Sequence, residues 1–406
     1  MNYDVVVIGT ELDGWVAAAR LLELGRSVCI AAPGEGSLHY APGGLHVLGH
    51  LQGQPVTEPY AGISALHDHH PYRLAGADRM HAALSWFDNS PLGAGFTYRG
   101  GQRCNSLAVT SAGLQLPVLS SCDHQAGVEQ VQGNVMTVLN FSGHRDFPSG
   151  LLAAEFIRNG ERVTAIAVDP PGARTDSVTI ANAFDTMDDP GAWFGDLSAV
   201  LPGDTDVLLV PAVLGSKRHR DVIAAATRAL DCTVLEVPTL PPCLPGIRLR
   251  NACERYIHEQ AGTLRRGFRV AGMDADQDRV RSVTGSTGQT IDVSAVILAT
   301  GGVLMGGLEV DSHGKITEPA MGLDACQTQP LSKVGAEQAV DALHRAGIET
   351  DEDFRPRHSG SRPWQNLHVT GRNLAHWNPG AEISAEGVAI VSGWLAAEAA
   401  HRELGS

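Results

Sequence analysis

The hydrophobic pattern at the amino-terminal end of the chain predicts a strand, a helix and a second strand in succession. Residues 3–8 read Tyr-Asp-Val-Val-Val-Ile, and the uninterrupted apolar run is typical of a parallel strand buried on both faces. Residues 15–24 are rich in Val, Ala, Leu and Arg, and the following Gly25 suits the end of a helix. A second apolar run covers residues 27–32. This order predicts a βαβ unit of the nucleotide-binding type.

Apolar runs late in the chain predict a return to the same sheet. Residues 294–299 form an apolar strand that ends in Thr300-Gly301-Gly302. Glycine at that point lets the backbone approach a cofactor closely. Such a strand, far from the first βαβ unit, is typical of flavoproteins that bind two dinucleotides. In these proteins the chain leaves the nucleotide domain, builds an inserted domain and returns.

We therefore expect an α/β protein with two domains. Residues 1–50 and 285–406 are predicted to form a Rossmann-like flavin-binding domain. Residues 51–284 are predicted to form an inserted α+β domain with mixed elements. Residues 386–399 read as a helix that begins beside Gly387. Its amino-terminal end could face the pyrimidine oxygens of a flavin, or it could be an ordinary packing helix.

Composition narrows the functional class. Hydrophobic residues make up 43% and charged residues 18% of 406 residues, so disorder and coiled coil are disfavoured. Asp and Glu number 45 against 30 Lys and Arg, giving a net charge of −15 that argues against a broad nucleic-acid surface. No apolar run has the length of a membrane span, and no signal peptide precedes the first strand, so we expect a cytoplasmic protein.

The turn after the first strand departs from the dinucleotide fingerprint at one position. The run Gly9-Thr-Glu-Leu-Asp-Gly14 keeps the first and third glycines of G-x-G-x-x-G, but Glu11 stands in the second place. A carboxylate is thus expected where a phosphate would sit. The second strand ends in apolar residues, and Glu35 comes slightly late for the acid that binds a ribose hydroxyl. NAD is therefore not expected, and FMN is favoured over FAD. A Rossmann-like unit that binds no nucleotide is the alternative.

Cysteine and histidine patterns give no expected metal site. The seven cysteines form no C-x-x-C pair, which argues against a disulfide framework and against a cluster or zinc held by this chain alone. The run His67-Asp68-His69-His70 resembles a metal cluster, but it lies in a predicted loop without helical spacing. We expect these side chains to be solvated.

Three residues are candidates for contact with substrate or flavin. His39 and His46 flank Gly43 and Gly44, in the loop expected to cross the isoalloxazine ring. Each could hydrogen-bond flavin or substrate, or could be a buried histidine with its partners satisfied. Arg248 lies near the start of a predicted helix, where an anion is favoured, and is our candidate for binding a phosphate.

Three runs together carry a family resemblance. The runs are Ser37-Leu-His39 through Leu48, then Pro238-Thr-Leu-Pro-Pro with Gly246-Ile-Arg248-Leu-Arg250-Asn251, and Ala299-Thr-Gly-Gly with Gly306-Gly307-Leu, Glu318-Pro-Ala-Met-Gly322-Leu-Asp324 and Gln327-Thr328. In their order and spacing they resemble the B subunit of the anaerobic glycerol-3-phosphate dehydrogenase. The resemblance covers most of the chain and is weakest from about residue 52 to 200. The chain departs from the family at Glu11 and at residues 380–387, where the family usually has glycine-rich turns.

The resemblance implies a flavoprotein of the fumarate reductase type that carries FMN, with FAD as the other possibility. It also implies an FAD-containing catalytic subunit, an iron–sulfur subunit that reaches the membrane quinone pool, and glycerol-3-phosphate as the substrate of the complex. The protein would then be an oxidoreductase subunit that relays electrons, is inactive alone, and meets the membrane only through a partner. The alternative is a non-catalytic scaffold of the same complex that has lost its cofactor. The expected flavin-binding residues are Gly9, Thr10, Glu11, Gly14, Ser37, Gly43, Gly44, Thr300, Gly301, Gly302, Gly371 and Gly387.

Overall fold

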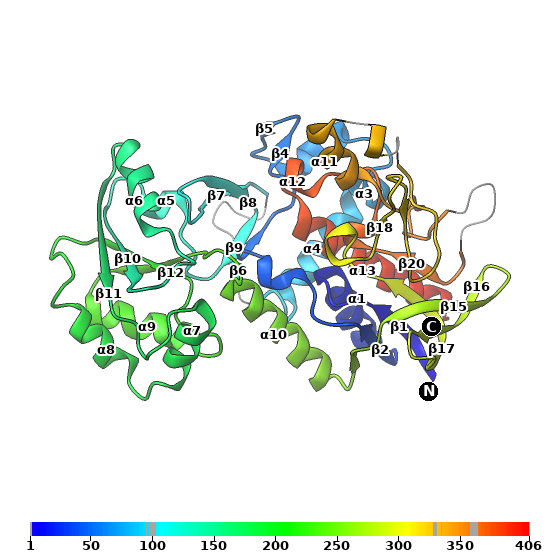
Figure 1. The fold of residues 1–406 in the computed structure, drawn as a ribbon, viewed down its shortest axis with the longest axis horizontal. Helices are drawn as coiled ribbons and strands as arrows, with labels where there is room; N and C mark the ends of the chain where they lie inside the picture. The colour runs from blue at the N-terminus through cyan, green and yellow to red at the C-terminus, as the bar shows by residue number, and fades with distance from the viewer. Residues whose placement is uncertain are drawn as a thin grey trace. The chain divides into compact units, whose positions relative to one another are not determined.

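The computed structural model describes residues 2–94, 96–97, 103–327, 331–333, 335–357 and 364–405. Thr328, the last residue of the third family run, lies outside these ranges. The chain forms two compact units (Figure 1). The first comprises residues 1–37, 46–94 and 251–406, and the second comprises residues 38–45 and 95–250.

The first unit is built on a seven-stranded sheet in the order β14-β2-β1-β17-β16-β15, with β20 also paired to β17. Neighbouring strands are parallel along the stretch β14-β2-β1-β17, and β20 also pairs with β17 in parallel. Strands β16 and β15 extend the sheet from β17 in antiparallel pairing. The strands are β1 (Asn2–Ile8), β2 (Val28–Ala32), β14 (Thr263–Arg266), β15 (Val270–Asp276), β16 (Arg279–Gly285), β17 (Thr290–Leu298) and β20 (Leu367–Val369).

Helix α1 (Leu12–Glu23) packs against the long carboxy-terminal helix α13 (Ala385–Glu403). Gly393 makes this contact possible, because a Cβ atom there would lie 2.4 Å from the carbonyl oxygen of Asp13. The other helices of the unit are α2 (Pro59–Gly62), α3 (Pro71–Ala75), α4 (Ala77–Asn89), α11 (Ala336–Arg345) and α12 (Pro379–Glu382), and its short strands are β4 (His50–Leu51), β5 (Gln54–Pro55), β18 (Glu309–Val310) and β19 (Ile316–Thr317).

The second unit contains a four-stranded parallel sheet in the order β11-β10-β12-β13. Its strands are β10 (Val135–Phe141), β11 (Arg162–Val168), β12 (Val207–Pro211) and β13 (Thr233–Val237), and its helices are α5 (Val128–Val131), α6 (Ser149–Arg158), α7 (Ser177–Thr186), α8 (Pro190–Leu197) and α9 (His219–Leu230). Short antiparallel strands complete it: β3 (Gly44–Leu45), β6 (Phe96–Thr97), β7 (Ser106–Val109), β8 (Gln115–Val118) and β9 (Ser120–Cys122). Helix α10 (Leu244–Glu259) begins in this unit and ends in the first.

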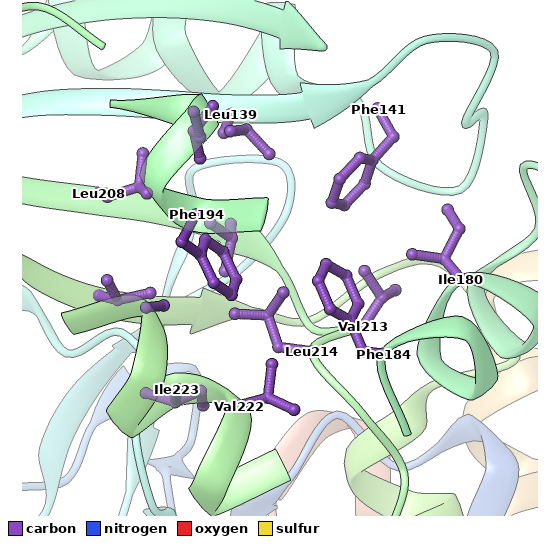
Figure 2. Close-up of a cluster of buried hydrophobic side chains, with 14 of the residues drawn as sticks. Leu139, Phe141, Ile180, Phe184, Phe194, Leu208, Val213, Leu214, Val222 and Ile223 are labelled. Carbon is purple, nitrogen blue, oxygen red and sulfur yellow. The ribbon is translucent and has the colours of Figure 1, made fainter. Parts of the chain in front are cut away.

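Side chains at alternate positions along the parallel strands belong to two different hydrophobic clusters of the second unit. One cluster joins the strands to α7, α8 and α9, and the other joins them to α5 and α6. In the first cluster, Phe184 stacks on Phe194 with ring centroids 5.7 Å apart, and Phe141 lies 6.3 Å from Phe184 (Figure 2). Each helix therefore buries an apolar face on the sheet, and this burial stabilises the unit.

The structure confirms the predicted α/β class, and the predicted βαβ unit and returning strand occupy the centre of the first sheet. The unit boundaries differ from the expected 51–284 insertion. Residues 51–94 and 251–284 belong to the first unit. The reason is that β14 adds to β2, β15 and β16 extend the sheet from β17, and α4 packs against α13. Across the part of the chain that the structure describes, no helix combines the length and hydrophobicity that crossing a membrane requires.

Candidate functional site

A cavity of about 290 Å³ opens in the first unit at the carboxyl ends of β1, β2 and β17. Its walls come from residues 8–11, 32–36, 269–270, 299–300, 305–307 and 319–320. Open α/β sheets bind their ligands at this edge, where the loops after the strands diverge. The cavity is therefore the candidate functional site of this unit.

The two glycines of the first turn serve the close packing of the strands. Gly9 has a φ of 116°, and a Cβ atom on it would lie 2.0 Å from the carbonyl oxygen of Ala299. At Gly14, a Cβ atom would lie 2.9 Å from the carbonyl oxygen of Gly9. Gly9 and Thr10 line the cavity, whereas Gly14 does not. The first and third glycines are thus required by the fold itself, and the first and second positions, Gly9 and Glu11, also line the cavity.

Glu11, in the second position, is held by the loop that follows β2. Its Oε1 accepts a hydrogen bond of 2.6 Å from the amide of Ser37, and its Oε2 accepts one from the Ser37 hydroxyl. Gly36 allows this contact, since a Cβ atom there would lie 2.7 Å from Oε1 of Glu11. Glu11 also lines the cavity. The sequence correctly indicated a carboxylate at this place, and the structure adds that two donors of Ser37 bind it.

Glu35 lies in the wall of the same cavity, in the loop that follows β2. An acid at the end of this strand is the group that binds ribose hydroxyls in dinucleotide-binding folds. The sequence pattern places Glu35 too late for this role, but the bend of the loop at residues 33–36 brings it to the cavity. Arg269 lines the cavity as well and provides a cation. Apolar walls come from Ile8, Ala32 and Val270.

These residues fit the adenosine side of a dinucleotide such as FAD. The apolar walls suit a base, Glu35 suits a ribose, and the turn at Gly9 and Thr10 is where phosphates meet this fold. A volume of about 290 Å³ lies at the lower end of the range for small-molecule sites. The cavity therefore suits the nucleotide half of FAD, with Glu11 as the one group that would repel a phosphate.

Most of the other predicted flavin-binding glycines pack against the chain itself. A Cβ atom on Gly302 would lie 2.4 Å from the carbonyl oxygen of Arg372, and one on Gly387 would lie 2.3 Å from the Tyr72 hydroxyl. Of the residues predicted from the sequence, Gly9, Thr10, Glu11 and Thr300 line the cavity. Those that do not line it are Gly14, Ser37, Gly43, Gly44, Gly301, Gly302, Gly371 and Gly387.

The two candidate histidines belong to different units. His39 lies in the second unit, where its carbonyl oxygen accepts the amide of Cys243 at 2.7 Å. His46 lies in the first unit, is buried, and has its Nδ1 2.8 Å from Oε2 of Glu386 at the start of α13. Although burial raises the pKa of Glu386, the charge and hydrogen bond of His46, with smaller effects of a backbone hydrogen bond and Arg372, lower it overall. His46 thus has a partly buried carboxylate partner, and neither histidine lines the cavity.

Arg248 is engaged in an internal ion pair of the second unit. Its guanidinium donates to both carboxylate oxygens of Glu236 at 2.5 and 2.9 Å, and to the carbonyl oxygen of Gly215 at 2.9 and 2.7 Å. Burial raises the pKa of Glu236, but the charge and hydrogen bonds of Arg248, together with His219 and the amide of Leu214, lower it more, so the net pKa is lowered. Four of the five guanidinium N–H groups are therefore used inside the protein, which favours a structural role over the phosphate binding expected from the sequence.

The expectation that residues 67–70 are solvated is wrong for one of them. His70 is buried, its Nδ1 accepts the amide of Tyr72 at 3.0 Å, and its Nε2 lies 2.9 Å from Oε2 of Glu382. It caps the start of α3. The other three side chains of the run are exposed or partly exposed, as expected.

Asp13 is a buried acid that the sequence pattern did not single out. It lies in the first turn of α1, and its Oδ2 accepts a 2.6 Å hydrogen bond from the hydroxyl of Thr370. Burial raises the pKa of Asp13 to about 7, the hydrogen bond from Thr370 lowers it only in part, and the charge of Glu11 raises it further. The one sequence signal was an acid inside an otherwise apolar helix. Asp13 links the first turn of the nucleotide-binding unit to the loop after β20.

A profile of the family described as FAD binding domain matches residues 4–388. The chain belongs to the FAD-binding domain family. The matched range starts in β1 and ends in α13, so it spans the whole α/β framework described above. This assignment agrees with a cavity that fits the adenosine side of FAD.

Relatives over nearly the full length confirm the resemblance inferred from the sequence runs. The chain is 27% identical over 425 residues to a protein of Vibrio cholerae serotype O1 named as the B subunit of anaerobic glycerol-3-phosphate dehydrogenase, covering 98% of this chain and 96% of that protein. It is 27% identical over 417 residues to the protein of the same name from Pectobacterium atrosepticum, covering 98% of both. Among solved structures, an E. coli quinol fumarate reductase aligns with 10% identity and a TM-score of 0.45, covering all of this chain and 71% of that one.

We predict that replacing Asp13 by Asn changes how stability depends on pH. The pKa of Asp13 is about 7 in the folded protein and near 3.8 in the unfolded chain. Native Asp13 therefore keeps its proton between these values while the unfolded chain loses it, and stability falls as the pH rises from about 4 to about 7. The Asn variant lacks this loss of stability. Between pH 4 and pH 8, its free energy of unfolding should therefore rise by on the order of 4 kcal/mol relative to that of the wild type.

Urea unfolding at the two pH values measures this gain. The matched control is Asp78→Asn, an exposed acid in the first turn of α4. A difference between variant and wild type that does not change with pH would contradict a raised pKa for Asp13.

We predict that Arg248→Met destabilises the second unit by about 3–5 kcal/mol, because the carboxylate of Glu236 is left buried without its partner. The double variant Arg248→Met, Glu236→Gln should recover much of that loss, since it removes both charges and keeps an acceptor for the amide of Leu214. Urea unfolding measures both. Arg228→Met, at an exposed site on α9, is the control and should have little effect. Equal losses in the single and double variants would show that the charge pair is not the cause.

Proposed function

We propose that the protein is an FAD-binding subunit of a glycerol-3-phosphate dehydrogenase assembly and relays electrons from glycerol-3-phosphate oxidation toward an iron–sulfur subunit and quinone. The observation that carries this proposal is the full-length similarity to proteins named as the B subunit of that enzyme, with 98% of this chain covered. Membership of the FAD-binding domain family supports the flavin. The alternative is a scaffold subunit of the same assembly that has lost its cofactor.

FAD is favoured over FMN as the resident flavin. FMN has no adenosine, so it would leave the ribose acid Glu35 and the apolar wall at Ala32 and Val270 without a ligand. FAD uses both. The sequence-based preference for FMN depended on the absence of a ribose acid and on the repulsion of a second phosphate by Glu11, and the place of Glu35 in the cavity wall weakens the first of these arguments.

Glu11 is the feature that favours the scaffold alternative. Its carboxylate lines the cavity next to the turn where a pyrophosphate would lie. The hydrogen bonds from Ser37 stabilise this charge. They reduce the repulsion of a nearby phosphate without removing it, so FAD would bind more weakly here than with glycine at this position.

We predict that Glu11→Gln tightens FAD binding. Gln keeps an oxygen acceptor for the Ser37 amide and removes one partly screened repulsion, worth on the order of 1 kcal/mol or about fivefold in Kd. Flavin fluorescence titration of the apoprotein measures this, with mass identification of the flavin released from the purified protein. Glu35→Gln is the matched comparison and should weaken FAD binding but leave FMN binding unchanged. Protein purified with its partners but without flavin would support the scaffold alternative, and released FMN would overturn the preference for FAD.

We predict that the chain oxidises glycerol-3-phosphate only within an assembly. Similarity to proteins named as one subunit of that enzyme supports further subunits, which we infer to be an FAD-containing catalytic subunit and an iron–sulfur subunit that provides contact with the membrane. The measurement is glycerol-3-phosphate oxidation with a dye acceptor, first by the purified chain and then by the chain co-expressed with its partners. Substantial turnover by the chain alone would contradict the subunit function and indicate an independent dehydrogenase.

A further inference from the structure

Three loops of the first unit are held side by side by backbone hydrogen bonds away from the nucleotide cavity. The amide of Cys326 donates to the carbonyl oxygen of Gly347 at 2.6 Å, which joins the loop after β19 to the segment after α11. The amide of Ile348 donates to Asn373 at 2.7 Å, and Ala375 donates back to Ile348 at 3.2 Å. These contacts join the same segment to the loop after β20. Side chains from all three loops therefore reach one place.

The side chains that meet there are Cys326, Glu349 and His376. Their donor atoms, a sulfur, a carboxylate oxygen and an imidazole nitrogen, lie within 4.8 Å of one another. Nε2 of His376 lies 2.8 Å from Oε1 of Glu349. The donors of a tetrahedral zinc ion lie about 3.5 Å apart, so small side-chain movements would bring these three to coordination distance. The three are half-buried or exposed, so an ion can reach them from solvent.

Two histidines of the 67–70 run lie beside this group. The imidazole rings of His67 and His69 have their centroids 5.3 and 5.5 Å from that of His376. A small cavity of about 20 Å³ is lined by His69, Glu349 and His376, and this is room for one water-sized particle. Arg357 also lines it, as an exposed side chain that can extend into solvent. His69 shares this cavity wall with Glu349 and His376 and is therefore the candidate for a fourth ligand, which a side-chain movement would bring to the other three.

We propose that Cys326, Glu349, His376 and His69 bind a divalent transition-metal ion, with Zn²⁺ as the best match. Thiolate and imidazole donors select zinc over magnesium or calcium, and zinc also accepts a carboxylate oxygen as a ligand. On binding, the thiol of Cys326 gives its proton to solvent and the metal replaces the hydrogen bond between His376 and Glu349. The ion would fasten three loops and the segment before α3 together. The site is separate from the proposed flavin function and does not depend on it.

Metal titration of the full-length protein, stripped with a chelator, tests the proposal. Isothermal titration with Zn²⁺ should give one ion per chain, and Co²⁺ should give a sulfur-to-metal charge-transfer band. Cys326→Ser should remove that band. His376→Asn suits the backbone, because His376 has a φ of 67° and Asn tolerates that region. Each variant should weaken zinc binding by more than the roughly 10- to 100-fold that loss of an outer-shell partner costs.

Cys104→Ser and His81→Asn are matched controls outside the group and should bind zinc as the wild type does. Melting curves without metal show whether each variant folds. Wild-type protein that gives no charge-transfer band with Co²⁺ overturns the proposal by itself, whatever the variants do. Zinc binding that is equal in the wild type, Cys326→Ser and His376→Asn overturns it as well.

Discussion

The close approach of β1 to β17 at Gly9 is the constraint on which the rest of the first unit depends. The two strands run parallel in register over six residue pairs, from Asn2 and Asp292 to Ile8 and Leu298. At their ends the backbone of Gly9 meets the carbonyl oxygen of Ala299 so closely that any side chain would collide with it. This contact joins the first strand to a strand nearly three hundred residues later. It also fixes the edge at which the nucleotide cavity opens, because the loops after both strands form its walls.

Several buried ionisable groups in the part of the chain that the structure describes are paired with a group of opposite charge. Glu236 and Arg248 satisfy each other in the second unit, while His46 meets Glu386 at the start of α13 and His70 meets Glu382 in α12. Asp13 differs, because its partner is the neutral hydroxyl of Thr370 and its burial favours the protonated form. A protonated acid in the first turn of α1 adds no second negative charge beside Glu11. The helix end thus keeps one carboxylate near the expected phosphate position, and that carboxylate has its own donors in Ser37.

The sequence predicted the parts of the fold whose signal is local. Strand β2 is an unbroken apolar run, and β1 and β17 each end in one, so their existence and parallel pairing could be inferred. Strand β10 was missed because Thr137 and Asn140 interrupt its apolar run, and its burial comes from neighbours on both sides. The candidate site was predicted less well than the fold. Arg248 was recognised as a notable cation, but its partner on β13 could be found only by knowing that the strand and α10 lie together. The burial of Asp13 beside Thr370 and the place of Glu35 in the cavity wall depend on distant partners and on loop shape, which no local sequence pattern encodes.

The three glycine positions of the dinucleotide fingerprint differ in their surroundings, and this difference explains why the second glycine can be replaced without loss of the fold. The first and third positions lie against the protein's own backbone and core at distances that exclude every side chain, although Gly9 also lines the cavity. They are therefore required whether or not a nucleotide binds. The second position meets the ligand in this fold, and its side chain is limited only by what the cavity must hold. Glu11 uses that freedom by bonding to Ser37, a contact that is open because Gly36 has no side chain. The fold thus requires glycine at the first and third positions. Only a bound cofactor would require glycine at the second position. The residue at the second position is therefore the informative one for deciding what the cavity binds.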